Sequence, residues 1–498
     1  MKRRAARRAV IDIGSNSVRL VIYEGPPRTP VAVFNEKALC GLGDRVPETG
    51  ALRQDAMDEA LRMLRRFSAV LEDDSIERLH CFATAASREA PNGAGFLDEV
   101  RAIGFAPTLL AGEEEARLAA LGILSGAPEV LAEPGGALAG DMGGGSLEIS
   151  RLLREAPEGI AHRTSLPLGA LRLSTLYEGN LKAARQAAET MLDDVAWLPP
   201  GETAPRSFFI VGGAWRAIGR MAIARDDHPI SILDHFALSA ERMTELCRLI
   251  EKQSPATLAA TPGVQSRRAP TLPYAAMVLR LVIARSGVSR VAISSCGVRE
   301  GSLFADLSEE ERQTDPLIAL CGHYADRLSP GSTKRRRAIF GFLAPAFEGE
   351  THQEARLRRA ATKLANVAGL FHPDTRANEA AVSVLNMPFI SLTHEERVML
   401  ACALYQRHTS SEADFPKHLH PQLLSDEQKT WARRVGLALR FATDLDPVGT
   451  NALPTARLAV REGTLVLTMG EGDGAYLGDA PRRRFEKFAG ALGLEAVV

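Results

Sequence analysis

The chain has 498 residues, enough for three or four domains, and it is 45% hydrophobic and 24% charged, like an ordinary soluble globular protein. Its 60 basic and 61 acidic side chains give a formal net charge of −1, which argues against a dominant nucleic-acid surface. No stretch reaches the roughly 18 uninterrupted apolar residues of a membrane span. We therefore expect neither nucleic acid nor a membrane as a partner.

The cysteines and the first residues predict a cytoplasmic location. The six cysteines are scattered without a C-x-x-C pair, which fits reduced thiols better than a disulfide framework. The basic residues 1–8 resemble the start of a signal peptide, but Asp12 and Gly14 interrupt the apolar run that would have to follow.

The first predicted elements are a strand, a tight turn and a second strand over residues 9–23, followed by a strand at 31–34 and a helix at 55–71. A buried-type strand at 79–84 then runs into a helix that Ser87 could cap. Arg88 in that first turn offers a guanidinium fork to an oxyanion, and its alternative role is that of a solvated surface residue.

Three consecutive acids, Glu113, Glu114 and Glu115, open the next predicted helix. Acids in a first turn favour the helix dipole, so a structural role alone would explain them. Because a helix repeats every 3.6 residues, the three cannot all face one side, and at least one can point into a cleft. Composition does not say which one.

A glycine-rich segment over residues 141–148 is the strongest chemical signal in the chain. Asp141 follows an apolar run and precedes three consecutive glycines, residues 143–145. Ser146 and Glu148 come next. Successive N–H groups of such a turn can form an anion-binding concavity, and the two carboxylates can hold a hard divalent ion beside it. The alternative is a plain glycine-rich hairpin closed by two solvated acids.

This segment has a gapless echo near the N-terminus. Residues 12–20 align with 141–149, so that Asp12 matches Asp141 and the polar run Ser15-Asn16-Ser17 matches the glycine turn. The simplest interpretation is two similar lobes that present polar turns to a shared cleft. Arg19 stands where Glu148 stands in the second copy, so we expect a metal to belong to the second lobe.

Beyond the second turn, strands with glycine-rich ends at 208–213 and 291–297 alternate with helices, which predicts a two-lobed α/β body to about residue 305. Residues 316–441 are almost wholly helical in pattern. They contain the basic run Lys334-Arg335-Arg336-Arg337, which is either a solvated helix face or a polyanion-binding surface. A hairpin over 456–468 and a helix over 481–492 form a small appended unit.

Four segments, at 10–17, 112–117, 140–146 and 297–301, together resemble the exopolyphosphatase/guanosine pentaphosphate phosphatase family. The resemblance implies an α/β fold of two actin-like (ribonuclease H-like) lobes, at 1–133 and 134–308. It also implies an all-α HD-like domain at 309–452 and a small C-terminal α/β unit at 453–498.

The resemblance further implies a Mg²⁺-dependent exopolyphosphatase, acting as a homodimer, that releases terminal orthophosphate from inorganic polyphosphate between the lobes. Glu115 matches the family's catalytic base, and Asp141 and Glu148 match its metal-binding acids. A monovalent cation such as K⁺ is a further candidate. The remaining matched positions form the phosphate-binding set: Asp12, Ser15, Asn16, Ser17, Arg88, Gly143, Gly144, Gly145 and Ser146.

One departure concerns the helical domain, where the stretch matching the family's His-Asp pair reads Leu364-Ala365-Asn366-Val367. Alanine and asparagine cannot replace that ligand pair, so we expect no second hydrolytic centre there. The run 334–337 is our candidate channel for the polyphosphate chain.

Three other functions stay open. The first is hydrolysis of guanosine pentaphosphate, with guanosine tetraphosphate as a related ligand. The second is phosphoryl transfer from polyphosphate to ADP, with Gly212 and Gly213 at the acceptor. The third is a non-catalytic polyphosphate sensor, which the presence of all three site acids disfavours.

Overall fold

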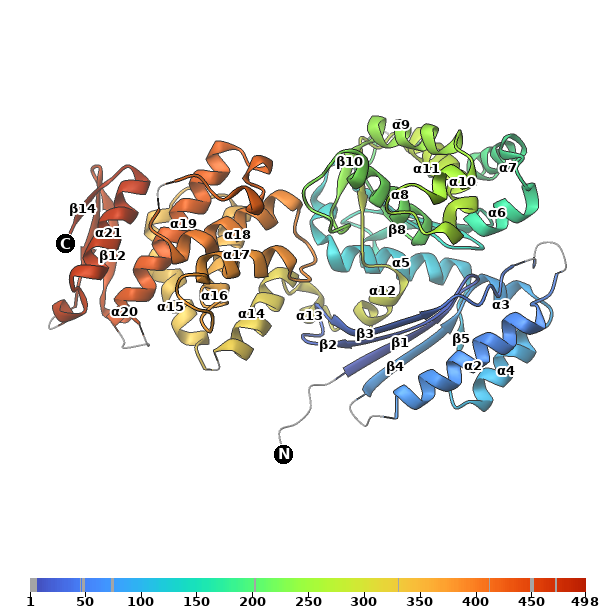
Figure 1. Cartoon of the computed structure of the whole chain (residues 1–498), viewed down its shortest axis with the longest axis horizontal. Coiled ribbons are helices and arrows are strands. Elements are labelled where there is room, and N and C mark those ends of the chain that lie inside the picture. Colours follow the sequence, from blue (N-terminus) through green and yellow to red (C-terminus); the bar gives the residue numbers. More distant parts are fainter. Residues whose placement is uncertain are drawn as a thin grey trace. The chain divides into compact units, whose positions relative to one another are not determined.

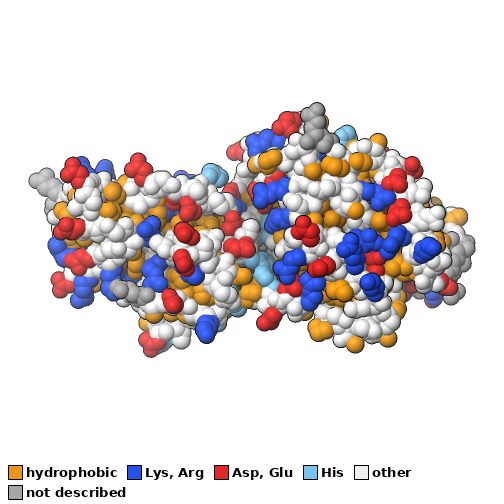
Figure 2. Space-filling view, turned by 90° about the horizontal axis from the view of Figure 1, so that it is seen from above, with side chains coloured by type: hydrophobic (Ala, Val, Ile, Leu, Met, Phe, Trp, Pro, Cys, Tyr) orange, Lys and Arg blue, Asp and Glu red, His pale blue; other side chains and the backbone are white. Residues whose placement is uncertain are grey.

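The computed structural model describes residues 7–44, 46, 50–72, 76–200, 203–329, 331–411, 413–447, 452–470 and 473–498. The chain divides into two compact units, residues 1–313 and 314–498. Among the described residues, no helix is long and apolar enough to cross a membrane. Basic and acidic side chains are interspersed over the face shown in Figure 2, in keeping with the near-zero net charge. Residues 1–6 of the basic N-terminal segment lie outside the described part of the chain.

The first lobe is a five-stranded sheet in the order β3-β2-β1-β4-β5, with α2 and α4 side by side along one face (Figure 1). Strands β1, β2 and β3 pair antiparallel, and β4 and β5 continue the sheet in parallel. Apolar residues of α2 such as Leu64 and Phe67 are fully buried in this core. The elements are β1 (Arg7–Ile13), β2 (Val18–Glu24), β3 (Val31–Ala38), α2 (Gln54–Val70), β4 (Ile76–Ala83), α3 (Ala85–Glu89), α4 (Gly93–Ala102) and β5 (Thr108–Leu109).

The second lobe is a six-stranded sheet in the order β10-β11-β9-β6-β7-β8. Helices α8, α9 and α11 contribute buried residues such as Trp215 and Met277 to the larger of its cores. The elements are β6 (Ala137–Met142), β7 (Leu147–Leu152), β8 (Ile160–Leu166), α6 (Ala170–Tyr177), α7 (Leu181–Asp193), β9 (Ser207–Val211), α8 (Gly213–Arg225), β10 (Ala237–Ser239), α9 (Ala240–Glu251), α10 (Pro255–Ala259), the 3₁₀ turn η3 (Ser266–Thr271), α11 (Leu272–Ser286) and β11 (Arg290–Ile293).

Two helices, α5 (Gly112–Gly126) and α12 (Val298–Ala305), pack on each other and join the lobes. Leu118 of α5 and Leu303 of α12 are buried against the first sheet, whereas Ala120 and Ile123 of α5 pack against the second. The crossing is close because a Cβ at Gly301 would lie 1.8 Å from the carbonyl oxygen of Leu118. The contact fixes the helix whose first turn carries Glu115.

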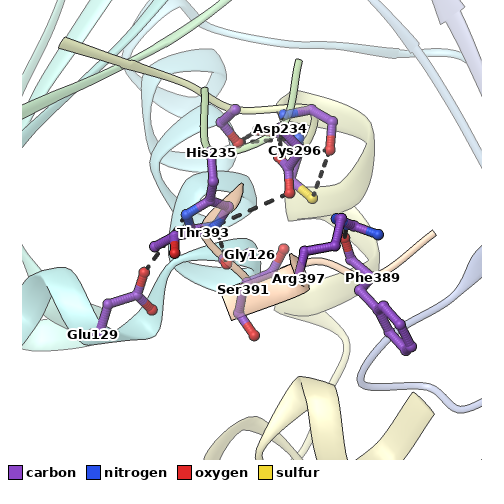
Figure 3. Close-up of polar contacts among 12 residues, drawn as sticks. Gly126, Glu129, Asp234, His235, Cys296, Phe389, Ser391, Thr393 and Arg397 are labelled. Atoms are coloured by element: carbon purple, nitrogen blue, oxygen red, sulfur yellow. Dashed lines mark hydrogen bonds and ion pairs between the residues drawn. The ribbon is translucent and has the colours of Figure 1, made fainter. Parts of the chain in front are cut away.

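Buried polar contacts hold the turn before α12 in place (Figure 3). Asp234 accepts hydrogen bonds from the backbone N–H and the Oγ of Ser295, both at 2.8 Å. The neighbouring His235 places Nε2 3.0 Å from the carbonyl oxygen of Gly126, at the end of α5. These bonds tie the ends of α5 and β11 together.

The second unit is mainly helical, as its sequence pattern predicts, and ends in a three-stranded sheet in the order β12-β13-β14. The predicted hairpin is present, whereas β14, which pairs in parallel with β13, was not predicted. The elements are α14 (Pro316–Leu328), α15 (Thr333–Leu343), α16 (His352–Leu364), α17 (Arg376–Asn386), α18 (His394–His408), α19 (Asp426–Leu445), α20 (Ala452–Thr455), β12 (Arg457–Arg461), β13 (Thr464–Thr468), α21 (Asp479–Leu492) and β14 (Glu495–Val497); α13 (Glu309–Gln313) ends the first unit.

Candidate active site

The two halves of the sequence repeat form equivalent hairpins. Asp12 pairs in register with Arg19 across β1 and β2, and Asp141 pairs with Glu148 across β6 and β7. Each turn is closed by the same bond, from the N–H of Gly14 to the carbonyl of Ser17 and from Gly143 to Ser146, both at 3.0 Å. The repeat is therefore structural, and only its second copy places two carboxylates side by side.

The two turns meet in the first unit. A Cβ at Gly144 would lie 3.3 Å from the Cβ of Ser15, and one at Gly145 would lie 3.0 Å from the Oγ of Ser15. Larger side chains in the second turn would push the turns apart. Among the described residues, the backbone N–H groups of Ser15, Asn16, Gly144 and Gly145 have no recorded hydrogen-bond partner.

Both turns line a cavity of about 430 Å³ that also receives the four acids Asp12, Glu115, Asp141 and Glu148. The structure thus brings together nearly all of the residues predicted to be catalytic, metal-binding or phosphate-binding. Arg88 is the exception, since it does not line the cavity: its Nη1 donates to the carbonyl of Leu110 at 2.7 Å and lies 3.4 Å from Oε2 of Glu115.

Of the three consecutive acids on α5, Glu115 is the buried one, 9% exposed, whereas Glu113 is exposed. Burial, followed by the charges of Glu148 and Asp141, raises the pKa of Glu115 well above its ordinary value, and Arg88 opposes this rise. A carboxyl group with a raised pKa is a stronger base than an ordinary glutamate.

Burial also raises the pKa values of Glu148 and Asp141. Burial raises the pKa of Glu148 to about 7, with a contribution from Asp141, although Ser165 donates a hydrogen bond to Oε1 of Glu148 at 2.8 Å. Burial also raises the pKa of Asp141 to about 6. Paired carboxylates in a low-dielectric site repel each other, and a cation relieves that repulsion.

This donor set fits Mg²⁺. Within the described ranges, no group of three or more His, Cys, Asp and Glu side chains is arranged as a complete metal cage. Magnesium is usually bound by one or two carboxylates together with waters and substrate phosphates, and Asp141 and Glu148 would be the residues to hold it here.

A set of basic side chains lines the same cavity as the acids and was not predicted as part of the site. Burial lowers the pKa of Lys37 to about 8, with Arg268, Arg19 and Arg216 adding their repulsion. Burial and Arg299 likewise lower the pKa of Arg216 to about 10. We call this set the cationic wall: Arg19, Lys37, Arg216, Arg220, Arg267, Arg268 and Arg299.

Most of the wall comes from segments without a recognisable motif. Arg216 and Arg220 lie one helical turn apart on α8, and Arg268 lies in η3. Two members fell within predicted motifs, Arg19 in the repeat 12–20 and Arg299 in the segment 297–301; Nη1 of Arg299 donates to Oδ2 of Asp12 at 3.1 Å. The i, i+4 spacing of Arg216 and Arg220 after the Gly212-Gly213 turn is the signal that sequence reasoning could have used.

One predicted cap is wrong. Ser87 does not precede α3 but lies inside it, and its Oγ is buried without a hydrogen-bond partner among the described residues. Thr84 occupies the N-cap position, because the extended backbone of β4 continues to that residue.

The basic run 334–337 lies on α15 of the second unit and divides into two kinds of residue. Arg335 pairs with Asp446, Nε to Oδ2 at 3.4 Å, and Arg336 contacts Asp326. Lys334 and Arg337 are exposed. Half of the run is thus engaged within its own unit.

Known proteins match both units. The Ppx/GppA phosphatase family model matches residues 21–310, more than half of the chain, and the exopolyphosphatase C-terminal model matches residues 337–497. Exopolyphosphatase 1 of Mycobacterium tuberculosis is 27% identical over 346 residues, which are 67% of this chain and 97% of that protein. Retrograde regulation protein 2 of Saccharomyces cerevisiae is 25% identical over 477 residues, 86% of this chain and 77% of that protein.

Solved structures share the fold. An exopolyphosphatase from Cytophaga hutchinsonii superposes with a TM-score of 0.53 at 23% identity and covers 60% of this chain and 97% of its own. The Ppx/GppA family member of Aquifex aeolicus gives 0.51 at 23% identity, covering 61% and 98%. With two α/β lobes, paired polar turns and matching family models, this chain belongs to the Ppx/GppA phosphatase family.

Proposed function

We propose that this chain is an exopolyphosphatase, which hydrolyses the terminal phosphoanhydride of inorganic polyphosphate in the cavity between its lobes. The observation that carries the proposal is the pairing of four acids with a cationic wall in one cavity. A phosphoryl-transfer site needs donors for the phosphate charge and an oriented water, and a polyanion needs cations for the rest of its length. The exopolyphosphatase from Mycobacterium tuberculosis supports this choice of substrate.

The two turns would hold the terminal phosphate. Ser15, Asn16, Gly144 and Gly145, whose N–H groups have no partner among the described residues, line the cavity from both lobes, as do Ser17 and Ser146. Backbone donors of this kind are preorganised, so they stabilise the phosphoryl oxygens without rearranging.

Glu115 would orient and deprotonate the attacking water. A bond forms between the water oxygen and the terminal phosphorus, the bridging P–O bond breaks, and the water proton passes to Glu115. The products are orthophosphate and a chain shorter by one phosphate. Mg²⁺ held by Asp141 and Glu148 would neutralise charge on the phosphoryl oxygens.

The cationic wall would hold the next phosphates of the chain. Its arginines and Lys37 repel each other in the free protein, which is the origin of the lowered pKa values of Lys37 and Arg216 beyond burial itself. Phosphates between them would relieve this repulsion. Lys334 and Arg337 are candidates for contacts with longer chains.

Guanosine pentaphosphate is the main alternative substrate, because it also ends in a phosphoanhydride. Orthophosphate release should be measured on polyphosphate, on guanosine pentaphosphate, and on polyphosphate with ADP, the last with ATP formation as a second readout. We expect the highest kcat/KM on polyphosphate. A higher value on the pentaphosphate would replace the proposed substrate, and binding without any release would indicate a sensor.

A further inference from the structure

The helical unit contains a cluster of positive charge that the cavity chemistry does not use. Its arginines come from five helices and lie near the end of α18, where burial and the neighbouring guanidinium groups lower the pKa of Arg407 to about 9. We call this set the helical arginine cluster: Arg335, Arg376, Arg407, Arg440 and Arg484.

Among the described residues, two aspartates pair with arginines of the cluster. Asp446 pairs with Arg335, and Asp444 contacts Arg484. Counted over these described residues alone, five arginines and two aspartates leave a formal excess of three positive charges. The hydrogen bonds of Arg376 within the described part of the chain go to backbone carbonyls, those of Gly369 and Phe371.

The backbone that carries the cluster is fixed by a close helix crossing. A Cβ at Gly436 of α19 would lie 2.6 Å from the carbonyl oxygen of Ala403 and 3.0 Å from the backbone nitrogen of Arg407, both on α18. Arg440 follows Gly436 by about one helical turn. The side chains of Arg407 and Arg440 therefore project from two helices that are packed tightly on each other.

Three side-chain atoms in the helical arginine cluster and the adjacent His408 are buried and lack a hydrogen-bond partner among the described residues. They are Nε of Arg407, Nε of Arg440 and Nε2 of His408. Buried donors are normally satisfied, so each calls for an explanation. The helix dipole favours cations in the last turn of α18, but it does not provide a partner for these nitrogens and does not reach Arg440, which lies well before the end of α19.

We propose that Arg407, His408 and Arg440 form a binding site for a phosphate-class oxyanion in the helical unit. Guanidinium groups present paired N–H donors that match the oxygens of a tetrahedral anion. Burial and the adjacent arginines lower the pKa of His408 to about 3, so its neutral ring supplies a single N–H. One dianion would offset most of the charge excess.

The same chemistry could come from free orthophosphate or from one phosphate of a longer chain. Hydrogen exchange of the full-length protein distinguishes them, with orthophosphate, sulfate and a short linear polyphosphate as probes against chloride at equal ionic strength. At a probe concentration of ten times its Kd, amides near the end of α18 and the middle of α19 should exchange roughly tenfold more slowly. Segments 12–17 and 141–148 report separately on the cavity, so failure here and failure of the proposed function are distinguishable.

The double variant Arg407→Gln/Arg440→Gln should lose this protection, and the exposed pair Arg482→Gln/Arg483→Gln should keep it. The single variant Arg407→Lys retains the charge but not the fork, and should weaken protection several-fold. Protection by orthophosphate and sulfate supports a free oxyanion, and protection by the chain alone supports a chain phosphate. The proposal is overturned if no probe exceeds chloride in the wild type, or if the double variant is protected as fully as the wild type.

Discussion

Nη1 of Arg88 lies 3.4 Å from Oε2 of Glu115, outside the lining of the cavity that Glu115 enters. Arg88 thus contacts Glu115 without lining the cavity, and its charge opposes the rise in the pKa of Glu115 that burial and Glu148 cause. Arg88 therefore acts on Glu115 through its charge, independently of any contact with a phosphate.

Arg88→Gln should therefore raise the pKa of Glu115 further. Because the base must be ionised, kcat at neutral pH should fall, and the acidic limb of the kcat profile should move to higher pH. Arg88→Lys keeps the charge and should leave the limb near its wild-type position. An unmoved limb with a raised KM in Arg88→Gln would instead assign the arginine to substrate binding.

Removal of the carboxylates of Asp141 and Glu148 should abolish the stabilisation of the protein by Mg²⁺. Mg²⁺ should raise the thermal midpoint of the wild-type protein, because it relieves repulsion between Asp141 and Glu148. In Asp141→Asn/Glu148→Gln this rise should vanish and the Mg²⁺ requirement for turnover should increase. Glu113→Gln, an exposed acid on α5, is the control. An unchanged Mg²⁺ response in the double variant would contradict the assignment.

Glu300 should make the protein sensitive to acid. Burial opposes its ionisation, but Arg299 and the N–H of Gly297 outweigh burial and hold the pKa of Glu300 below its ordinary value. Its contribution to stability is therefore complete above the unfolded pKa of about 4.3 and is lost as pH falls through the lower folded value. Thermal midpoints measured from pH 6 down to pH 3 should fall less steeply for Glu300→Gln than for the wild type.

The hydrogen bond that Tyr23 donates to Oε1 of Glu300, at 2.6 Å, joins β2 to α12. Tyr23→Phe should destabilise the first unit by about 1–3 kcal/mol, because a charged acceptor loses its partner. A midpoint equal to that of the wild type at pH 7 would show that the bond does not contribute.

In the basic run on α15, we expect the two exposed residues, Lys334 and Arg337, to contact the polyphosphate chain. Lys334→Gln/Arg337→Gln should weaken binding of long polyphosphate more than short, and should flatten the salt dependence of binding, because fewer counterions are exchanged. Arg482→Gln/Arg483→Gln is the matched control. Equal losses for all chain lengths would exclude a role for Lys334 and Arg337 in a chain-binding track.

The hairpins could be predicted from sequence because their turn chemistry is local. Glycine and serine positions determine each turn, and the register then places Asp141 opposite Glu148. The choice of Glu115 among three acids depended on the family resemblance, because the burial that distinguishes it from Glu113 arises only in the folded chain.

The cationic wall could not be predicted because it is assembled by tertiary structure. Arg216 and Arg268 are 52 positions apart in the numbering, and only the folded chain brings both to the lining of the cavity. Strand β14 was missed because three residues carry little periodicity, and its parallel pairing with β13 depends on the intervening α21.

The most direct test of the proposed mechanism is orthophosphate release from polyphosphate by Glu115→Gln, measured beside the wild type and Glu113→Gln, with chain binding measured in parallel. We predict that the wild type and Glu113→Gln release orthophosphate at similar rates. Glu115→Gln should lose about 10²–10⁴-fold in kcat and bind the chain as tightly as the wild type. Wild-type turnover by Glu115→Gln would contradict the role of Glu115 as the base that activates water.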